Sequence, residues 1–554
     1  MVVFTVLRRS GAVRLGASSD RVSPPRAQPE DVARTWFLSA GQRGNRWTRV
    51  RPWTTGNAVR ALVHGSEYFA ALADAIEDTG DGDLILFTDW RGDPDERLRA
   101  DGPTVEEALK AAVLRGVQVK GLVWRSHTDR FRFSNEENRD LSQALNDVGG
   151  EVLLDQRVRP LGSHHQKFFV IRHPSRPQDD VAFVGGIDLA HGRRDDADHR
   201  GDPQTQRFSS KYGDTPAWHD VQVEVRGPAV RDVEDTFRER WEDPAALSRL
   251  PWQVLPDILH RLDRSPGRLH VPEPNPPPAG TCAVQILRTY PNRWPGYRFA
   301  RNGERSVARG YAKAARRARR LIYIEDQYLW SVEVARVFAD ALRRTPELHL
   351  VAVVPRHPDI EDPVSVAAID LGHSQALEMV QAVAPDRVHI FDIVNHDGLP
   401  VYVHAKVCVV DDVWATVGSD NFNRRSWTHD SELTAAVLDE RRDGREPVDP
   451  AGAGVGARVF ARDLRLRLLR EHLDRDDDAG LIDPVEAVGH MQSAAAALDA
   501  WHEGGCVGPR PPGRLREHRV APLPRWQRVL AGVPYRTIID PDGRPPGMKL
   551  GRLH

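Results

Sequence analysis

Cysteine and lysine are both scarce in this sequence of 554 residues. The three cysteines, Cys282, Cys408 and Cys506, are widely separated and show no CxxC or metal-type spacing. That pattern excludes a disulfide framework and a cysteine-based zinc site. Nearly all cations are arginine, and only seven lysines occur. The position of each lysine is therefore informative.

Long apolar runs are also absent. No window approaches the roughly 18 uninterrupted apolar residues of a membrane span, so we expect no transmembrane segment. At the amino terminus the apolar residues precede the arginines, the reverse of a secretory signal. We expect a cytoplasmic protein, or one peripheral to a membrane. The 77 Lys+Arg balance 79 Asp+Glu, which argues against a dedicated nucleic-acid binder.

The composition, 40% hydrophobic and 28% charged, allows a large buried core. The main boundary is predicted at residues 271–280, a proline-rich run that fits neither a helix nor a central strand. It separates an amino-terminal half, 31–270, from a carboxy-terminal half, 281–475. We expect residues 1–30 to be a flexible arm and residues 476–554 to be an irregular extension.

The two halves show the same predicted order of elements, a weak internal repeat. Helical spacing and short apolar runs alternate in each half. The expected elements of the first half are Ser66–Thr79, Leu84–Thr88, Val105–Arg115 and Val117–Trp124. Those of the second half are Ser306–Arg319, Leu321–Glu325, Val332–Arg343 and Leu348–Val354, and an amphipathic helix follows at Arg458–Leu473. The alternation predicts an α/β sandwich in each half.

A histidine and a lysine two residues apart precede a strongly apolar run at two places, His165 with Lys167 and His404 with Lys406. On an extended chain, residues i and i+2 point the same way, so an imidazole and an ammonium lie side by side. A second apolar run ending in a glycine turn follows each, which predicts two hairpins. One such pair would be typical of a solvated strand face. Two pairs at matched positions predict a single site shared between the halves.

Two imidazoles and two ammonium groups suit attack on a phosphodiester. A neutral imidazole can attack phosphorus, a protonated one can protonate the leaving oxygen, and the ammonium groups can stabilise the non-bridging oxygens. We expect this chemistry to need no metal or other cofactor. With ordinary histidine pKa values near 6.5, the two rings should titrate as a coupled unit around neutral pH.

These motifs resemble the phospholipase D superfamily, whose signature is HxK(x)4D followed by GG or GS and an Asn or Asp. The second motif matches through His404, Lys406, Asp411, Gly418, Ser419 and Asn421. The first matches through His165, Lys167, Gly185, Gly186 and Asp188. Arg172 stands where the first signature Asp is expected, and it is either a departure at the site or a solvated hairpin residue.

The resemblance spans roughly residues 35–475 and is closest to the eukaryotic-type phospholipase D core. It implies an α/β fold of two similar sandwich halves with the active site at their interface. It also implies that the glycine-turn residues of both motifs bind substrate and that Asp411 belongs to the catalytic set.

The same resemblance implies that His165 is the nucleophile, forming a phosphohistidine, and that His404 acts first as acid and then as base. Each histidine would be oriented by a carboxylate, at Asp220 and at Glu432, with Asp430 a second candidate for the latter. Which acid orients which histidine stays open at this point. For Glu432, the alternative to orienting a histidine is a salt bridge to Arg424 or Arg425.

The activity implied is hydrolysis of a glycerophospholipid at a membrane surface, giving phosphatidic acid and the head-group alcohol, or transfer of the phosphatidyl group to another alcohol. The alternatives are a cardiolipin synthase-like transferase, a nuclease or general phosphodiesterase, and a phosphate-binding module without turnover. Because one chain carries both motifs, we expect that no oligomer is required. The sequence fixes neither the head group nor calcium dependence.

Overall fold

The computed structural model describes residues 29–549 except 127–134, 207, 249–254, 256, 260–264, 272–273, 330 and 520–522. The expected arm, apart from its last two residues, and part of the expected linker lie outside the described residues. Within those residues, no helix combines the length and the apolar composition needed to cross a bilayer.

A sixteen-stranded sheet runs through the whole molecule. In its amino-terminal part the strands lie in the order β1-β8-β6-β5-β2-β3-β4. Their bounds are β1 Thr54–Val63, β2 Leu84–Asp89, β3 Gln118–Trp124, β4 Glu151–Asp155, β5 Phe168–Arg172, β6 Val181–Gly185 and β8 Val221–Arg226. Strands β2, β3 and β4 are parallel, and the others pair antiparallel.

The carboxy-terminal part repeats that order as β9-β17-β16-β15-β11-β12-β13, with β18 added at its edge. The bounds are β9 Cys282–Tyr290, β11 Leu321–Asp326, β12 His349–Val353, β13 Val388–Ile393, β15 Lys406–Val410, β16 Trp414–Gly418, β17 Glu432–Asp439 and β18 Leu515–Glu517; β10, Glu304–Arg305, pairs with β9. Strands β1 and β9 pair antiparallel at the centre, so the two repeats form one continuous sheet.

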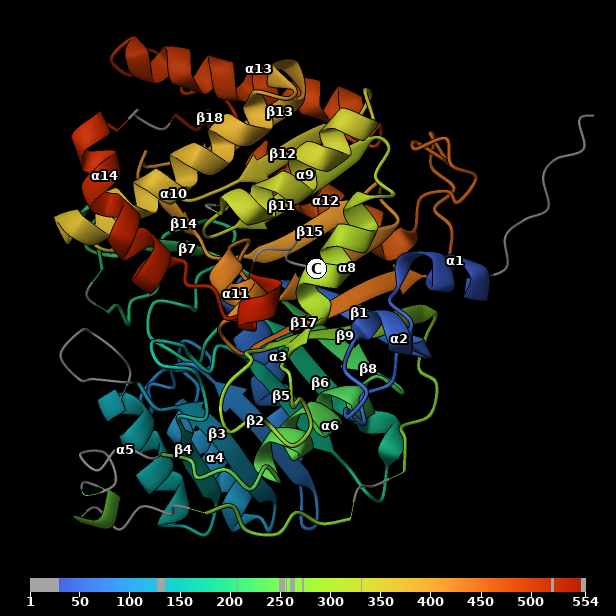
Figure 1. The fold of residues 1–554 in the computed structure, drawn as a ribbon, viewed down its shortest axis with the longest axis vertical. Coiled ribbons are helices and arrows are strands. Elements are labelled where there is room, and N and C mark those ends of the chain that lie inside the picture. The colour runs from blue at the N-terminus through green and yellow to red at the C-terminus, as the bar shows by residue number, and fades with distance from the viewer. Residues whose placement is uncertain are drawn as a thin grey trace, which may run out of the picture.

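Helices cover both faces of this sheet, as Figure 1 shows, with the amino-terminal half below and the carboxy-terminal half above. One face carries α3 Gly65–Glu77, α4 Val105–Leu114, α5 Asn135–Asn146, α8 Ser306–Ala315, α9 Val332–Arg344 and α10 Pro363–Gln381. On the other, α6 Val230–Trp241 and α12 Val459–His472 share one hydrophobic core with strands of both halves. The expected α/β architecture of two similar halves is confirmed.

Local chemistry explains where the helices begin. The Thr104 hydroxyl accepts the Glu107 N–H while the Glu107 carboxylate accepts the Thr104 N–H, a capping box that starts α4. At α10, Asp362 caps the amino terminus and Pro363 occupies the first position, where its missing N–H costs nothing.

The segment 476–554, expected to be irregular, instead contains regular structure. Helix α13, Pro484–Glu503, packs beside β18, and α14, Arg525–Pro534, packs on α10. Asp483 caps α13 and Pro484 follows it, the start signal that predicts a helix here. The correction matters because β18 completes the sheet edge beside β13.

Candidate active site

The two histidine-lysine motifs lie at equivalent places in the two halves. Each leads into a hairpin, β5 with β6 and β15 with β16, so the predicted hairpins are confirmed. The histidines stand just before their strands begin, and the lysines fold back onto them. The Lys167 ammonium donates to the His165 carbonyl oxygen at 3.0 Å, and the Lys406 ammonium donates to the His404 carbonyl oxygen.

Each histidine is hydrogen-bonded to a carboxylate of the opposite half. His165 Nδ1 lies 3.0 Å from Glu432 Oε2, and His404 Nδ1 lies 2.6 Å from Asp220 Oδ2. Because both bonds use Nδ1, they leave Nε2 of each ring for chemistry. The alternative salt bridge from Glu432 to Arg424 or Arg425 does not form, since Arg424 pairs with Glu333 at 2.9 Å and Arg425 with Asp430 at 2.6 Å.

Backbone hydrogen bonds between the halves hold these pairs together. The His165 N–H donates to the Ser431 carbonyl at 3.0 Å, and the His404 N–H donates to the His219 carbonyl at 2.8 Å. Two short strands, β7 Ala217–His219 and β14 Val401–Val403, pair in parallel. This pairing brings His404 beside Asp220. The site is therefore built from one motif and one acid-bearing segment of each half.

Burial sets the charge state of this cluster. It raises the pKa of Glu432 to about 8 and raises the pKa of Asp220. Burial and the neighbouring lysines lower the pKa values of His165 and His404 well below the ordinary range. In both pairs these shifts oppose separate charges on the imidazole and the carboxylate. Burial also lowers the pKa of Lys406 to about 8.

Asp411, expected in the catalytic set, lies at the far end of β15. Its carboxylate accepts the backbone N–H groups of Arg319, Arg320 and Leu321 at 2.7, 2.8 and 2.9 Å. Five residues beyond Lys406 place it roughly 16 Å away along an extended strand. This position is a correction: Asp411 ties the end of β15 to the start of β11 and does not touch the histidines.

Arg172, the departure from the signature, is buried rather than solvated. Its guanidinium binds Asp180 at 2.7 Å and also the carboxylate of Glu234 on α6. The solvated-hairpin interpretation is wrong. Since Arg172 is the counterpart of Asp411 and both are structural, the departure leaves His165 and Lys167 in place.

The missing Cβ atoms of the glycine turns allow the backbone to lie close to neighbouring side chains. A Cβ at Gly186 would lie 2.5 Å from Asp220 Oδ1, and one at Gly185 or Gly418 would overlap side chains of the neighbouring strand. The Ser419 hydroxyl donates to Glu432 Oε2 at 2.6 Å, which fixes that carboxylate under His165.

The remaining residues expected to bind substrate, Asp188 and Asn421, occupy equivalent positions after the two glycine turns. Burial raises the pKa of Asp188, but the Lys167 ammonium at 3.4 Å, the Arg193 guanidinium and other neighbouring groups together outweigh it and lower that pKa to about 2. Asn421 is buried, and its Oδ1 has no hydrogen-bond partner within the part of the chain that the structure describes.

Sequence reasoning missed the aromatic groups against the histidines. Trp90 meets the His165 ring edge-on with centroids 6.3 Å apart, and Trp218 lies 4.8 Å from the His404 ring. The Arg193 guanidinium stacks 3.7 Å from the Trp218 ring centre. Trp90 follows β2 directly. Its position at the carboxyl end of a predicted buried strand is the sequence feature that could have indicated a place near the site.

Family models match two overlapping parts of the chain. The model described as Phospholipase D matches residues 129–352, and that described as Cardiolipin synthase, PLD-like domain matches residues 314–443.

Two relatives show the extent of similarity to known proteins. The chain is 26% identical over 487 residues to phospholipase D A of Dictyostelium discoideum, covering 75% of this chain and 35% of the relative. It is 26% identical over 551 residues to phospholipase D beta 2 of Arabidopsis thaliana, covering 76% and 58%. This chain thus spans only part of the length of these relatives. A solved phosphatidylserine synthase of Haemophilus influenzae aligns with a TM-score of 0.47 at 13% identity, covering 74% of this chain and 87% of that one.

Proposed function

Because this chain belongs to the phospholipase D superfamily, we propose that it hydrolyses the distal phosphodiester of a glycerophospholipid, releasing phosphatidic acid and the head-group alcohol. One observation carries the proposal. Two histidines, each paired through Nδ1 with a carboxylate of the opposite half, stand beside two buried lysines.

In the first step, Nε2 of His165 attacks phosphorus and the bond to the head-group oxygen breaks. His404 gives its proton to that oxygen, so the head group leaves as an alcohol. Glu432 accepts a hydrogen bond from Nδ1 of His165 and stabilises the positive charge that develops on the ring. The ammonium groups of Lys167 and Lys406 oppose the charge on the non-bridging phosphate oxygens.

In the second step, neutral His404 takes a proton from water, whose oxygen attacks phosphorus and breaks the bond to His165. Phosphatidic acid leaves and both rings return to their starting states. The bound phosphate supports this cycle because its negative charge raises the pKa of His404 above the value that burial and the lysines impose.

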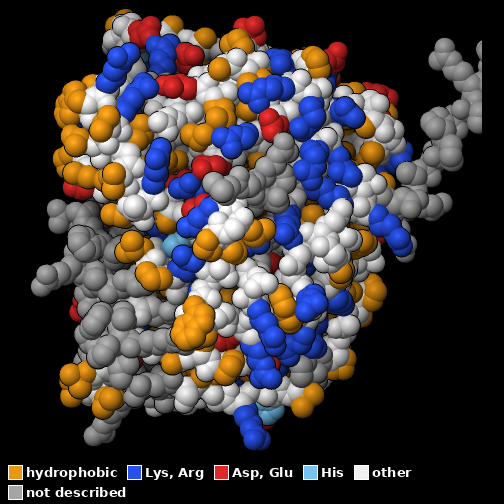
Figure 2. Space-filling model, viewed as in Figure 1, with side chains coloured by type: hydrophobic (Ala, Val, Ile, Leu, Met, Phe, Trp, Pro, Cys, Tyr) orange, Lys and Arg blue, Asp and Glu red, His pale blue; other side chains and the backbone are white. Residues whose placement is uncertain are grey.

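An exposed apolar helix supports a lipid surface as the place of action. On α14, Trp526, Val529, Leu530 and Val533 are 64% to 76% exposed and recur at helical spacing. Figure 2 shows hydrophobic side chains gathered over this helix at the edge of the molecule. Arg525 and Arg536 flank the stripe. An apolar face between cations is typical of helices that lie in the headgroup region of a bilayer.

A second candidate is transfer of the phosphatidyl group to a lipid alcohol. The match of residues 314–443 to the cardiolipin synthase model favours it. The two reactions share the first step and differ only in the acceptor that attacks the phosphohistidine.

The test is to incubate the protein with phosphatidylcholine vesicles, with and without ethanol, and to measure choline, phosphatidic acid and phosphatidylethanol. We expect choline release, with loss of at least about a thousandfold in His165→Ala and His404→Ala. His490→Ala, an exposed histidine of α13, is the matched control and should keep full activity. Phosphatidylglycerol as substrate tests the transfer reaction through cardiolipin formation.

Failure of wild-type protein to act on any glycerophospholipid would reject the proposal. The membrane contact is tested separately with Trp526→Ser and Leu530→Ser. Both should weaken vesicle binding in a sedimentation assay while leaving hydrolysis of a short-chain, monomeric phospholipid unchanged.

A further inference from the structure

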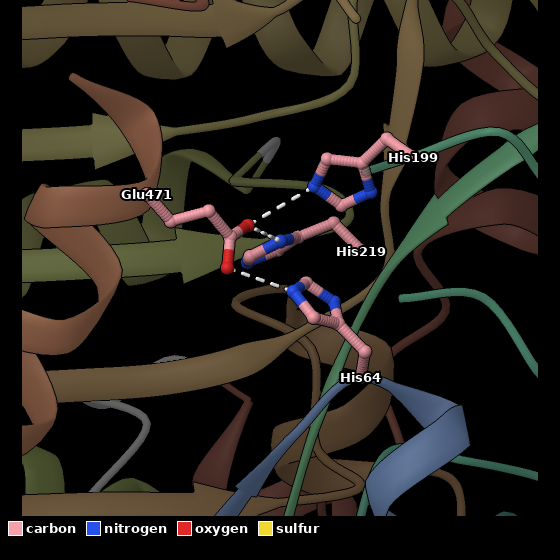
Figure 3. Close-up of side chains that lie close together, drawn as sticks. All are labelled: His64, His199, His219 and Glu471. Atoms are coloured by element: carbon pink, nitrogen blue, oxygen red, sulfur yellow. Dashed lines mark hydrogen bonds and ion pairs between the residues drawn. The ribbon is translucent and has the colours of Figure 1, made fainter. Parts of the chain in front are cut away.

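Three buried histidines and the partly buried Glu471 converge behind the Asp220–His404 pair, outside the site described above. His64 follows β1, His199 lies in a loop of the same half, His219 ends β7, and Glu471 comes from the last turn of α12. Figure 3 shows the three imidazoles directed at the Glu471 carboxylate.

We propose that these four residues bind a divalent transition metal ion of the zinc type. Glu471 oxygens lie 2.8 Å from His64 Nε2, 3.0 Å from His199 Nε2 and 3.4 Å from His219 Nδ1, and all four ligand atoms lie within 4.8 Å of one another. Zinc bonds of about 2.0–2.2 Å in tetrahedral geometry separate ligand atoms by roughly 3.3 Å. The three distances to Glu471 are close to that value, and the remaining pairs of ligand atoms lie within 4.8 Å. Imidazole ligands favour zinc and its neighbours over magnesium or calcium.

An outer contact of one histidine fits the same ion. The second ring nitrogen of His219, Nε2, lies 2.7 Å from Glu325. The other Glu325 oxygen lies 2.8 Å from His472 Nε2. Histidines that ligate a metal usually direct their other N–H at a carboxylate, which fixes the tautomer.

A purely hydrogen-bonded network is the alternative, with His219 protonated on both ring nitrogens because both face carboxylates. Zinc binding distinguishes the two. The backbone at the cluster is constrained as well, since His64 and His199 have φ angles of 75° and 55°, in the left-handed region that favours glycine. Strain of this kind persists where the surroundings hold a side chain in place.

An access route exists. A cleft of about 570 Å³ opens on His64 and Glu471, and its walls include Asp196, Asp474 and Arg467. A hydrated cation could therefore reach the ligands without unfolding of the core.

The position of the ion implies a structural role, because four protein ligands leave no open coordination position. Three ligands come from the amino-terminal half and Glu471 from the other, so the ion would join them. His219 offers its carbonyl to the N–H of His404, and the His64 N–H donates to the Asp220 carbonyl at 2.8 Å. The ion would thus fix the backbone that aligns the Asp220–His404 pair.

The test starts from full-length protein treated with a chelator and dialysed. Zinc is then titrated, bound metal is measured by mass spectrometry, and cobalt(II) serves as a spectroscopic probe. We expect one equivalent of zinc per chain, a tetrahedral cobalt spectrum, a higher melting temperature with zinc, and no displacement by magnesium or calcium. His199→Gln and Glu471→Gln should weaken zinc binding at least tenfold, whereas His490→Gln should not.

Two results would overturn the proposal: wild-type protein that binds no saturable equivalent of zinc or cobalt, or binding that persists unchanged in both cluster variants. If either variant fails to fold, the wild-type cobalt spectrum decides alone, because cobalt that keeps its aqueous spectrum is not held by this cluster. None of these readouts depends on phospholipid hydrolysis, so failure of the proposed activity leaves the test intact.

Discussion

At the scale of single residues, the histidine of each half is paired with a carboxylate from the other half. His165 uses Glu432, and His404 uses Asp220. Neither half contains a complete histidine-carboxylate pair of its own motif. A substitution of either acid therefore impairs a histidine that lies 267 residues away for Glu432 and 184 residues away for Asp220.

The acids should matter through their ability to ionise. Glu432→Gln and Asp220→Asn keep the size of the side chain but remove the ionisable carboxyl group that stabilises the imidazolium as it forms, so we expect kcat to fall by about 10²- to 10⁴-fold. Steady-state kinetics on phosphatidylcholine would measure the loss. Glu503→Gln, an exposed acid of α13, should behave as wild type. Full kcat in both site variants would show that the pairs are only structural.

Lys406 should impose an alkaline limit on activity. Burial lowers its pKa to about 8, so the ammonium that opposes phosphate charge is lost as pH rises through that value. The profile of kcat/KM between about pH 6 and pH 10 should fall on its alkaline side. Lys406→Arg keeps its charge across that range and should move the fall to higher pH. An unmoved alkaline limb in the arginine variant would assign it to another group, such as Glu432.

At the scale of elements, the equivalent strand ends are held by different contacts in the two halves. The Asp411 carboxylate accepts backbone N–H groups at the start of β11 in one half, while the Arg172 guanidinium forms ion pairs that join β5 to α6 in the other. Helix α6 carries many charged residues and is nevertheless buried, because partners such as Arg172 neutralise its acids.

Restoring the signature at Arg172 should therefore harm the protein. Arg172→Asp and Arg172→Met both leave Asp180 buried without its cation and Glu234 with Arg238 alone, which we expect to cost about 3–5 kcal/mol of unfolding free energy. Urea denaturation would measure it, with Arg176→Met, a more exposed arginine, as control. A gain of kcat/KM in Arg172→Asp would instead place this position in the catalytic machinery.

At the scale of the whole molecule, one sheet passes through both repeats and the site forms where they meet. Because a single chain supplies both motifs and both acids, activity should not depend on association of chains. Specific activity should stay constant over a wide range of protein concentration.

Mixing His165→Ala with His404→Ala protein provides the sharper test. If each chain builds its own site, every molecule in the mixture lacks one histidine, and no activity should return after co-incubation or after joint refolding. Recovery of activity would show that motifs from two chains can combine, as in an exchanged dimer. Wild-type protein diluted with an equal amount of either variant serves as the control.

The sequence by itself determined the helices and strands around the two motifs and the identity of the reactive groups. Helical spacing predicted α4 as Val105–Arg115, against Val105–Leu114 observed, and the paired motifs located His165 and His404. These features are local, because side-chain periodicity reflects which face of one element is buried.

Only the tertiary structure decided which acid meets which histidine, that Asp411 and Arg172 are structural, and that His219 and Glu471 come together. Those contacts join segments up to hundreds of residues apart. They depend on the order of the strands in the sheet and on how the two halves pack together. The periodicity of a single segment contains no information about strand order or about that packing.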